Sequence, residues 1–421
     1  MVNHRPLFCC FWQKFSDFFH SAQNLRVRPD VHVFQGKLTL DKKLIFAGAL
    51  ALCGVFFTAD STGLRASAAL DETARFLAGK GVASDSKLAA YAQTRFYARY
   101  TGQIKAGWMR FQRPNLESMQ TWWKKYAPAK YSTVFYPFSG PDIANAITFF
   151  PDADTYLMFG LEPPGIIPDP LAMRNEMIGA GLNGLRASLN TIFQVNFFIT
   201  KGMEKKLGRR SFNSITGLIM FFLAMCDCEV TGAKKIAVGP GAALVPGTAA
   251  DDSINWRNPP HSRVPGVEIS FRRNFGKIQT VLYFMLNVAD ASLAKSSPNF
   301  SPYLKSRGRF ATMIKSAAYL MHKDSAREQP AHFDRIRELV LTQSDFIVQD
   351  DSGVPLRFFA RDRWRLLFHG RYDAPIPLFW NMLQKDFRAE MQKNSTGRLP
   401  FSYGYDYKPG ESNLMTAERI Q

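Results

Sequence analysis

The sequence predicts an α/β or α+β fold in which helices flank a mixed sheet. Three observations support this fold class: short apolar runs alternate with helix-like segments, residues 130–162 have a strand–helix–strand pattern, and a tight turn near residue 275 joins two β-rich runs. Aromatic residues make up 14% of the chain and charged residues 21%, which is typical of a packed domain and excludes a disordered chain.

The strand–helix–strand pattern is a βαβ-like unit. Lys130–Phe138 is β-rich, Ile143–Phe150 is a short helix with Pro141 suited to its first turn, and Thr155–Leu161 is a second apolar strand. If the two strands are parallel, the loops that follow them lie at one edge of the sheet, where open α/β sheets bind ligands. We therefore expect Ser139, Asp142 and Glu162 to share one crevice.

The other predicted elements follow from apolar periodicity and turn residues. The expected helices are 70–130, 170–227, Phe310–His322, Phe333–Leu341 and Pro377–Met391, and the expected strands are Lys235–Val238, Val267–Arg272, Ile278–Val288, Asp345–Gln349 and Arg363–Phe368. Within the second helical region, the apolar run Ile215–Met225 is too short to span a membrane and is expected in the core.

The N-terminal region predicts export. The uncharged apolar run Leu44–Ala59 follows Lys42 and Lys43, and the Ala-x-Ala-like stretch 65–68 follows it, which is typical of a signal peptide cleaved after Ala68. Residues 1–68 are then a leader. Residues 69–421 form the globular region, either one large domain or two joined near 239–258. The alternative is an uncleaved inner-membrane anchor, although 16 apolar residues are fewer than the roughly 20 that span a bilayer.

A lipoprotein signal is a further alternative for the leader. Residues 50–53, Leu-Ala-Leu-Cys, resemble a lipobox that would place the lipid on Cys53. Leu52 stands where such a signal has a small residue.

The net charge of +18 favours anionic partners or simply a well-solvated surface. The basic residues occur in scattered pairs rather than in a block, and an exported chain rarely meets nucleic acid. We expect anionic envelope components or a small polar ligand as partners, no nucleic acid, and membrane contact only through an uncleaved leader. No metal is expected, because the histidines lack metal-ligand spacing, and no cofactor. Beyond the leader only Cys226 and Cys228 remain, expected as buried free thiols without a disulfide.

Two loops supply the candidate functional residues. The leading hypothesis is a periplasmic or secreted protein that binds an anionic or polar ligand in a loop crevice. The candidate ligand-binding residues are Ser139, Gly140, Asp142 and Glu162. One alternative is a periplasmic hydrolase that uses loop carboxylates, with Asp142, Glu162, Asp350 and Asp351 as candidate catalytic residues. Another is a structural envelope protein whose loops only turn the chain.

Two further patterns carry less weight for function. Gly179–Gly184 matches G-x-G-x-x-G, but the preceding residues are helical rather than a strand, so packing between helices is the better explanation. Asp350 and Asp351 are adjacent on an extended segment, so their side chains should point to opposite faces rather than form an acid–base pair.

Four short segments resemble an uncharacterised family of exported bacterial proteins. They are FYPFSGPD at 135–142, LEPPG at 161–165, QDDSGVP at 349–355, and the W-x-L-x-x-x-G-x-Y pattern at 364–372. No activity is known for that family, so the resemblance implies no functional residues. It implies only that these loops belong to one site.

Overall fold

The computed structural model describes residues 61–126, 130–196, 212–248, 250–251, 263–326, 331–405 and 407–420. The apolar run 44–59 and most of the predicted leader lie outside the described residues. The chain divides into two units, Met1–Leu64 and Arg65–Gln421, and the second is described below. None of the helices in the described part combines the length and apolar character that a membrane span requires.

Ten strands form one mixed sheet within the described residues, in the order β4-β3-β5-β6-β2-β1-β7-β8-β10-β9. Their bounds are β1 Thr133–Tyr136, β2 Thr155–Gly160, β3 Cys228–Val238, β4 Leu244–Pro246, β5 Val264–Arg273, β6 Ile278–Met285, β7 Phe310–Ile314, β8 Ser344–Gln349, β9 Trp364–Gly370 and β10 Asn413–Arg419. The five central strands, β6-β2-β1-β7-β8, are parallel, and antiparallel strands flank them on both sides. The predicted mixed sheet is therefore confirmed.

The strand order reverses between β1 and β7. From β1 the chain adds β2 and later β6 on one side, and then returns to add β7 and β8 on the other. Such a reversal is the topological switch point of a doubly wound sheet, where ligands of open α/β sheets bind. Strands β3 and β5, which precede and follow the loop at 239–258, pair directly, so both flanks of that loop belong to one sheet.

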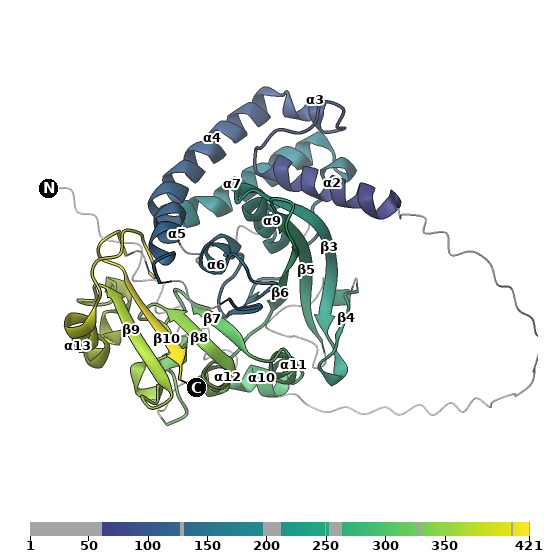
Figure 1. Ribbon diagram of the computed structural model, residues 1–421. Helices are drawn as coiled ribbons and strands as arrows, with labels where there is room; N and C mark the ends of the chain where they lie inside the picture. The colour runs from purple at the N-terminus through teal and green to yellow at the C-terminus, as the bar shows by residue number, and fades with distance from the viewer. Residues whose placement is uncertain are drawn as a thin grey trace, which may run out of the picture. The chain divides into compact units, whose positions relative to one another are not determined.

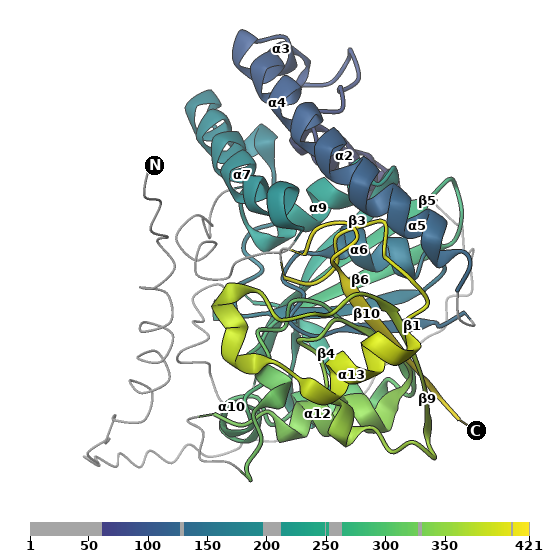
Figure 2. The same cartoon turned by 90° about the vertical axis from the view of Figure 1, so that its left-hand side faces the viewer.

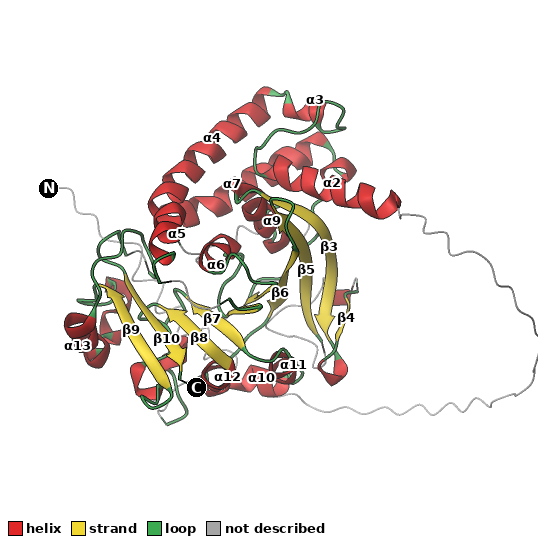
Figure 3. Ribbon diagram, in the orientation of Figure 1, coloured by secondary structure: helices red, strands yellow, loops and turns green. Residues whose placement is uncertain are grey.

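Helices cover both faces of the sheet (Figures 1, 2 and 3). Side chains alternate along β1: Val134 and Tyr136 enter one core cluster, and Phe135 enters the other. The first cluster packs under α2 Ser61–Leu77, α4 Arg95–Phe111, α5 Ser118–Trp123, α6 Ile143–Phe149, α7 Asn175–Val195 and α9 Ile215–Met225. The second packs under α10 Asp290–Lys295, α11 Phe300–Ser306, α12 Asp334–Gln343 and α13 Lys385–Asn394. The short α3, Ala89–Ala92, precedes α4.

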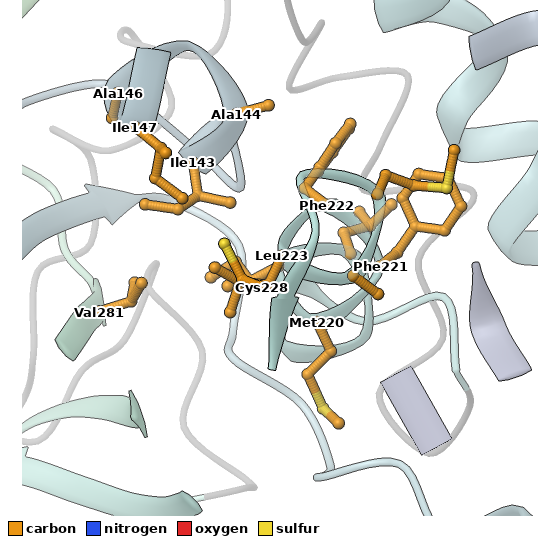
Figure 4. Close-up of a cluster of buried hydrophobic side chains, with 14 of the residues drawn as sticks. Ile143, Ala144, Ala146, Ile147, Met220, Phe221, Phe222, Leu223, Cys228 and Val281 are labelled. Carbon is orange, nitrogen blue, oxygen red and sulfur yellow. The ribbon is translucent and has the colours of Figure 1, made fainter. Parts of the chain in front are cut away.

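Helix α9 is the centre of the first core cluster. All of its residues are buried, which confirms the prediction of a core helix for Ile215–Met225. Ser214 begins it, and its hydroxyl accepts a hydrogen bond from the backbone N–H of Gly217 at 3.2 Å. Figure 4 shows Ile143 and Ile147 of α6 near Leu223 of α9. Both predicted free thiols follow α9, and burial raises the pKa of Cys228 to about 12, so this thiol is unreactive.

The βαβ-like unit is confirmed: β1, α6 and β2 occur in that order, and the two strands are parallel. The hairpin of β5 and β6 is confirmed as well. Gly179–Gly184 lies inside α7, with no strand before it. A Cβ at Gly184 would approach the side chain of Asn213 to 2.8 Å, as expected for close packing through a small residue.

Two predicted helices are wrong. The segment Phe310–His322 contains strand β7, followed by a tight loop, because it pairs with β1 and β8 in the middle of the sheet. A five-residue apolar run cannot be assigned to helix or strand by periodicity alone. The predicted helix Pro377–Met391 is divided into a 3-10 turn at Pro377–Met382 and the helix α13.

Glycine packing under α9 gives a first prediction. A Cβ at Gly217 would lie 1.9 Å from the backbone oxygen of Phe212, whereas one at Gly102 of α4 meets nothing within 4 Å. We expect Gly217→Ala to lower the free energy of unfolding by about 1–3 kcal/mol, because the backbone must move. Gly102→Ala should raise it by up to about 1 kcal/mol through helix propensity. Urea denaturation of both variants measures the difference, and equal effects would contradict this packing.

Candidate functional site

The loops after four parallel strands lie at one edge of the sheet, here called the carboxyl edge. These strands are β1, β2, β7 and β8, and the predicted parallel pairing of β1 with β2 is confirmed. All six candidate residues lie in these loops and are buried, and the five that carry a side chain are at most 4% exposed. They are Ser139, Gly140, Asp142, Glu162, Asp350 and Asp351.

The loop after β1 is tied to the end of β2. The hydroxyl of Ser139 donates to the backbone oxygen of Phe159 at 3.2 Å, and the N–H of Gly140 donates to the same oxygen at 3.3 Å. Gly140 has a φ of +52°, which favours glycine. It is buried, yet no atom of the described residues, apart from its two chain neighbours, lies within 4 Å of the position that a Cβ would occupy. Among the described residues, the turn therefore borders an open space on the Cβ side of Gly140.

Glu162 lies beside this turn. Its side chain is buried, with 3% exposure, and its backbone oxygen accepts a hydrogen bond from the Tyr283 hydroxyl at 2.9 Å. A Cβ at Gly160 would lie 2.8 Å from the Glu162 Oε2 and 3.4 Å from the Cα of Gly140. The structure therefore brings Glu162 together with Ser139 and Gly140.

Asp142 points toward β7 and forms a buried ion pair. Its carboxylate accepts a hydrogen bond from the ammonium of Lys315 at 2.8 Å, and the two side chains are 3% and 0% exposed. The Tyr136 hydroxyl and the Asn145 amide also donate to Asp142, at 2.9 and 2.7 Å. Neither Ser139 nor Asp142 caps α6 through its side chain. Because β1 and β7 flank the switch point, this ion pair joins the two halves of the sheet.

Two asparagines extend the ion pair into a network. Asn196, at the end of α7, accepts hydrogen bonds from Asn145 at 3.0 Å and from Lys315 at 3.4 Å. The Asn145 side chain is fully buried, and its Oδ1 accepts no hydrogen bond within the described part of the chain. Rotating that amide would place its oxygen against the acceptors of Asp142 and Asn196. The orientation of the Asn145 amide is therefore fixed, and its Oδ1 can still accept a hydrogen bond from a donor outside the network.

Asp350 and Asp351 lie on the other side of β7 and face different partners, as their adjacency predicts. Asp350 accepts hydrogen bonds from the Ser316 N–H at 2.9 Å and from the Ser352 hydroxyl at 2.6 Å. Asp351 accepts from Asn413 at 3.1 Å and from the hydroxyls of Tyr319 and Tyr407. Burial, together with the charge of Asp351, raises the pKa of Asp350 to about 7, and burial also raises the pKa of Asp351.

A segment near the C-terminus covers this part of the edge. The hydroxyls of Tyr403, Tyr405 and Tyr407 donate to the Ile314 oxygen at 3.3 Å, the Ser316 oxygen at 2.7 Å and Asp351 at 3.1 Å, respectively. The backbone of Ser402 is held on both sides, by Asn115 at 3.2 Å and by Asn196 at 2.7 Å. The ends of β7 and β8 are therefore closed by the protein itself, and the ends of β1 and β2 are the part of the edge that borders the open space.

The loop after β7 has an unusual backbone. Ser316, Ala318 and Tyr319 have φ values of +54°, +52° and +52°, a region that residues other than glycine seldom adopt. Asp350, Ser352 and Tyr405 hold this loop through backbone hydrogen bonds. Such backbone conformations persist only where the surroundings fix them. The predicted loop 349–353 therefore stabilises the backbone conformation of the residues that follow Lys315.

Sequence reasoning missed Lys315, Asn145, Asn196 and the three tyrosines of the C-terminal segment. The wrong helix prediction for Phe310–His322 hid the position of Lys315 at the end of a strand. A lysine directly after a short apolar run could have indicated that position. Nothing in the sequence places Asn196 or the tyrosines near the carboxyl edge. Across the described ranges, no group of three or more His, Cys, Asp or Glu side chains could hold a metal ion.

The buried ion pair gives a second prediction. Lys315→Met leaves the Asp142 carboxylate buried without its counter-ion, and we expect a loss of about 3–5 kcal/mol in the free energy of unfolding. The double variant Lys315→Met/Asp142→Asn should lose less than the sum of the two single variants. Lys234→Met is the control, because Lys234 pairs with Glu268 at the surface and should contribute at most about 1 kcal/mol. Additive losses in urea denaturation would contradict a coupled buried pair.

The raised pKa of Asp350 gives a third prediction. Above its ordinary pKa near 4, the unfolded chain releases a proton that the folded protein holds until about pH 7. The stability that this group contributes is present below pH 4 and is lost as the pH rises through 7. The unfolding free energy of the wild type, relative to Asp350→Asn, should therefore fall between pH 4 and 7, by an amount on the order of a few kcal/mol.

The wild type must be compared directly with Asp350→Asn, because two buried histidines change the free energy of unfolding with pH in the opposite direction. Burial lowers the pKa of His322 to about 3 and that of His369 to about 4, so these residues destabilise the protein as the pH falls below about 6.5. The wild type and Asp350→Asn share that effect, so the difference between them reports the titration of Asp350 together with its coupling to Asp351. A difference that is constant with pH would contradict the raised pKa.

Comparisons with known proteins found no relative of this chain. No model of a protein family, no curated protein and no solved structure matches the chain. The resemblance to a family of exported bacterial proteins stays a prediction.

Proposed function

We propose that this protein binds a small polar ligand of the nucleoside type at the carboxyl edge, beside Gly140 and Glu162. The observation that carries the proposal is the open space at Gly140, a buried residue at the turn after β1 and next to the switch point. Ligands of doubly wound sheets bind at this position, and glycine at the first turn lets the backbone approach them closely.

Glu162 supports the nucleoside class. In doubly wound folds that bind nucleotides, an acidic residue about 20 residues after the glycine turn accepts hydrogen bonds from the ribose hydroxyls. Glu162 follows β2, is separated from Gly140 by a similar length of chain, and lies next to that turn in space. An acceptor at this place suits a ligand with neighbouring hydroxyl groups.

The hydrolase alternative has weaker support. The raised pKa of Asp350 is typical of functional carboxyls. However, Asp350 and Asp351 are covered by the C-terminal tyrosines, and their hydrogen bonds within the described residues hold loops of the fold together. Export and a periplasmic or secreted location remain part of the proposal, since the evidence for them lies in the sequence of the leader.

Isothermal titration with three probes tests the proposal: adenosine, S-adenosylmethionine and adenosine monophosphate. We expect binding through the adenosine group that all three probes share, because its neighbouring ribose hydroxyls are the groups that an acidic residue at this position accepts. Glu162→Gln should weaken binding by about tenfold, since a hydrogen bond to a charged acceptor contributes about 1.5–3 kcal/mol.

Two glycine variants separate binding from folding. Gly140 and Gly308 both have positive φ and open space at the Cβ position, but Gly308 precedes β7 and lies at the opposite edge. Gly140→Ala and Gly308→Ala should therefore strain the backbone alike, whereas only Gly140→Ala should abolish binding. The proposal is contradicted if none of the three probes binds the wild type, or if both glycine variants bind equally well.

A further inference from the structure

The hairpin between β5 and β6 (Figure 1) ends in a tight turn, and the phenylalanine at its tip is exposed and has an unfavourable backbone conformation. The N–H of Gly276 donates to the Arg273 oxygen at 2.8 Å, and the two central residues, Asn274 and Phe275, have φ values of +46° and +57°. This is a type I′ turn, in which glycine is favoured at the position of Phe275. A bulky residue with positive φ is rare.

Exposure makes this residue more unusual still. Phe275 is 88% exposed, the highest value among the large apolar side chains described, and the nearby Ile278 is 52% exposed. The fold gains almost no burial from Phe275 and only partial burial from Ile278, while a glycine at 275 would relieve the backbone. A side chain held outward at a conformational cost indicates a contact outside the chain.

The tip itself is rich in basic residues. Residues 272–278 contain Arg272, Arg273 and Lys277 and no acidic residue. Acidic residues of neighbouring elements pair with two of them: Arg272, which lies 5.7 Å from the Phe275 ring centre, pairs with Glu229, and Lys277 pairs with Asp154. Arg273 forms no ion pair within the described part of the chain, so the tip keeps one positive charge that is not paired there.

The shape of the tip decides between two kinds of partner. A stable protein interface covers about 800 Å² on each side, which a convex turn with two exposed apolar side chains does not offer. Shallow insertion of an aromatic ring between anionic headgroups needs only such a tip with adjacent basic residues. We propose that the β5–β6 hairpin tip, residues 272–278, docks on an anionic lipid surface through Phe275.

This orientation is compatible with access to the carboxyl edge. Strand β6 begins at Ile278 and runs parallel to β2, so the hairpin tip lies at the opposite edge of the sheet from Gly140 and Glu162. A membrane under the tip leaves the carboxyl edge facing away from it. Docking of the hairpin tip does not depend on ligand binding at the carboxyl edge, so a negative result for one proposal does not contradict the other.

Vesicle flotation of the full chain tests the inference, with vesicles of 30% phosphatidylglycerol in phosphatidylcholine and with phosphatidylcholine alone. We expect stronger binding to the anionic vesicles, and weakening by about tenfold in Phe275→Ala, in line with the loss of one buried aromatic side chain. Phe275→Trp should bind at least as tightly as the wild type. The leader is present in every variant and therefore does not affect the differences between them.

Three variants make the outcome specific. Trp380→Ala removes another exposed aromatic side chain, 68% exposed and outside the tip, and should bind like the wild type. Arg273→Glu should weaken binding to anionic vesicles only. Phe275→Gly should raise Tm by about 2 °C while losing vesicle binding, which excludes misfolding as the cause. Equal binding of Phe275→Ala and the wild type, or equal losses in Phe275→Ala and Trp380→Ala, would overturn the inference.

Discussion

The buried ion pair between Lys315 and Asp142 is the constraint on which the carboxyl edge depends. Two charges removed from water must be compensated inside the protein, and the compensation here comes from elements far apart in the chain. Tyr136 and Asn145 complete the shell of Asp142, and Asn196 joins Lys315 to the end of α7. Through the other end of its amide, Asn196 holds the backbone of the C-terminal segment at Ser402. These side chains therefore form one connected polar network across the switch point.

This network divides the carboxyl edge into two parts. On the side of β7 and β8, tyrosines of the C-terminal segment fill the edge, and Asp350 and Asp351 hold loops together. On the side of β1 and β2, the Gly140 turn keeps an open space beside Glu162. Under the binding proposal, the half at β1 and β2 holds the ligand, while the half at β7 and β8 stabilises the fold. That division is why the binding proposal has better support than catalysis by the acidic loop.

The opposite edge of the sheet raises a separate question of surface chemistry. Phe275 gains almost no burial and adopts a backbone conformation suited to glycine, so the folded chain alone gives it no role. Its basic neighbours make an anionic surface the most suitable partner. The two edges thus present different chemistry: a buried polar network at one, and an exposed aromatic tip with cations at the other.

Local periodicity and turn residues were enough to predict the fold class, the βαβ unit, the core helix 215–225 and the hairpin. The sequence also indicated the loops after β1, β2 and β8. The central strand Phe310–Ile314, and with it the contact between Lys315 and Asp142, could not be predicted, because a short apolar run takes its conformation from the strands beside it. The roles of Asn196 and the C-terminal tyrosines likewise depend on long-range pairing, which leaves no pattern in the local sequence.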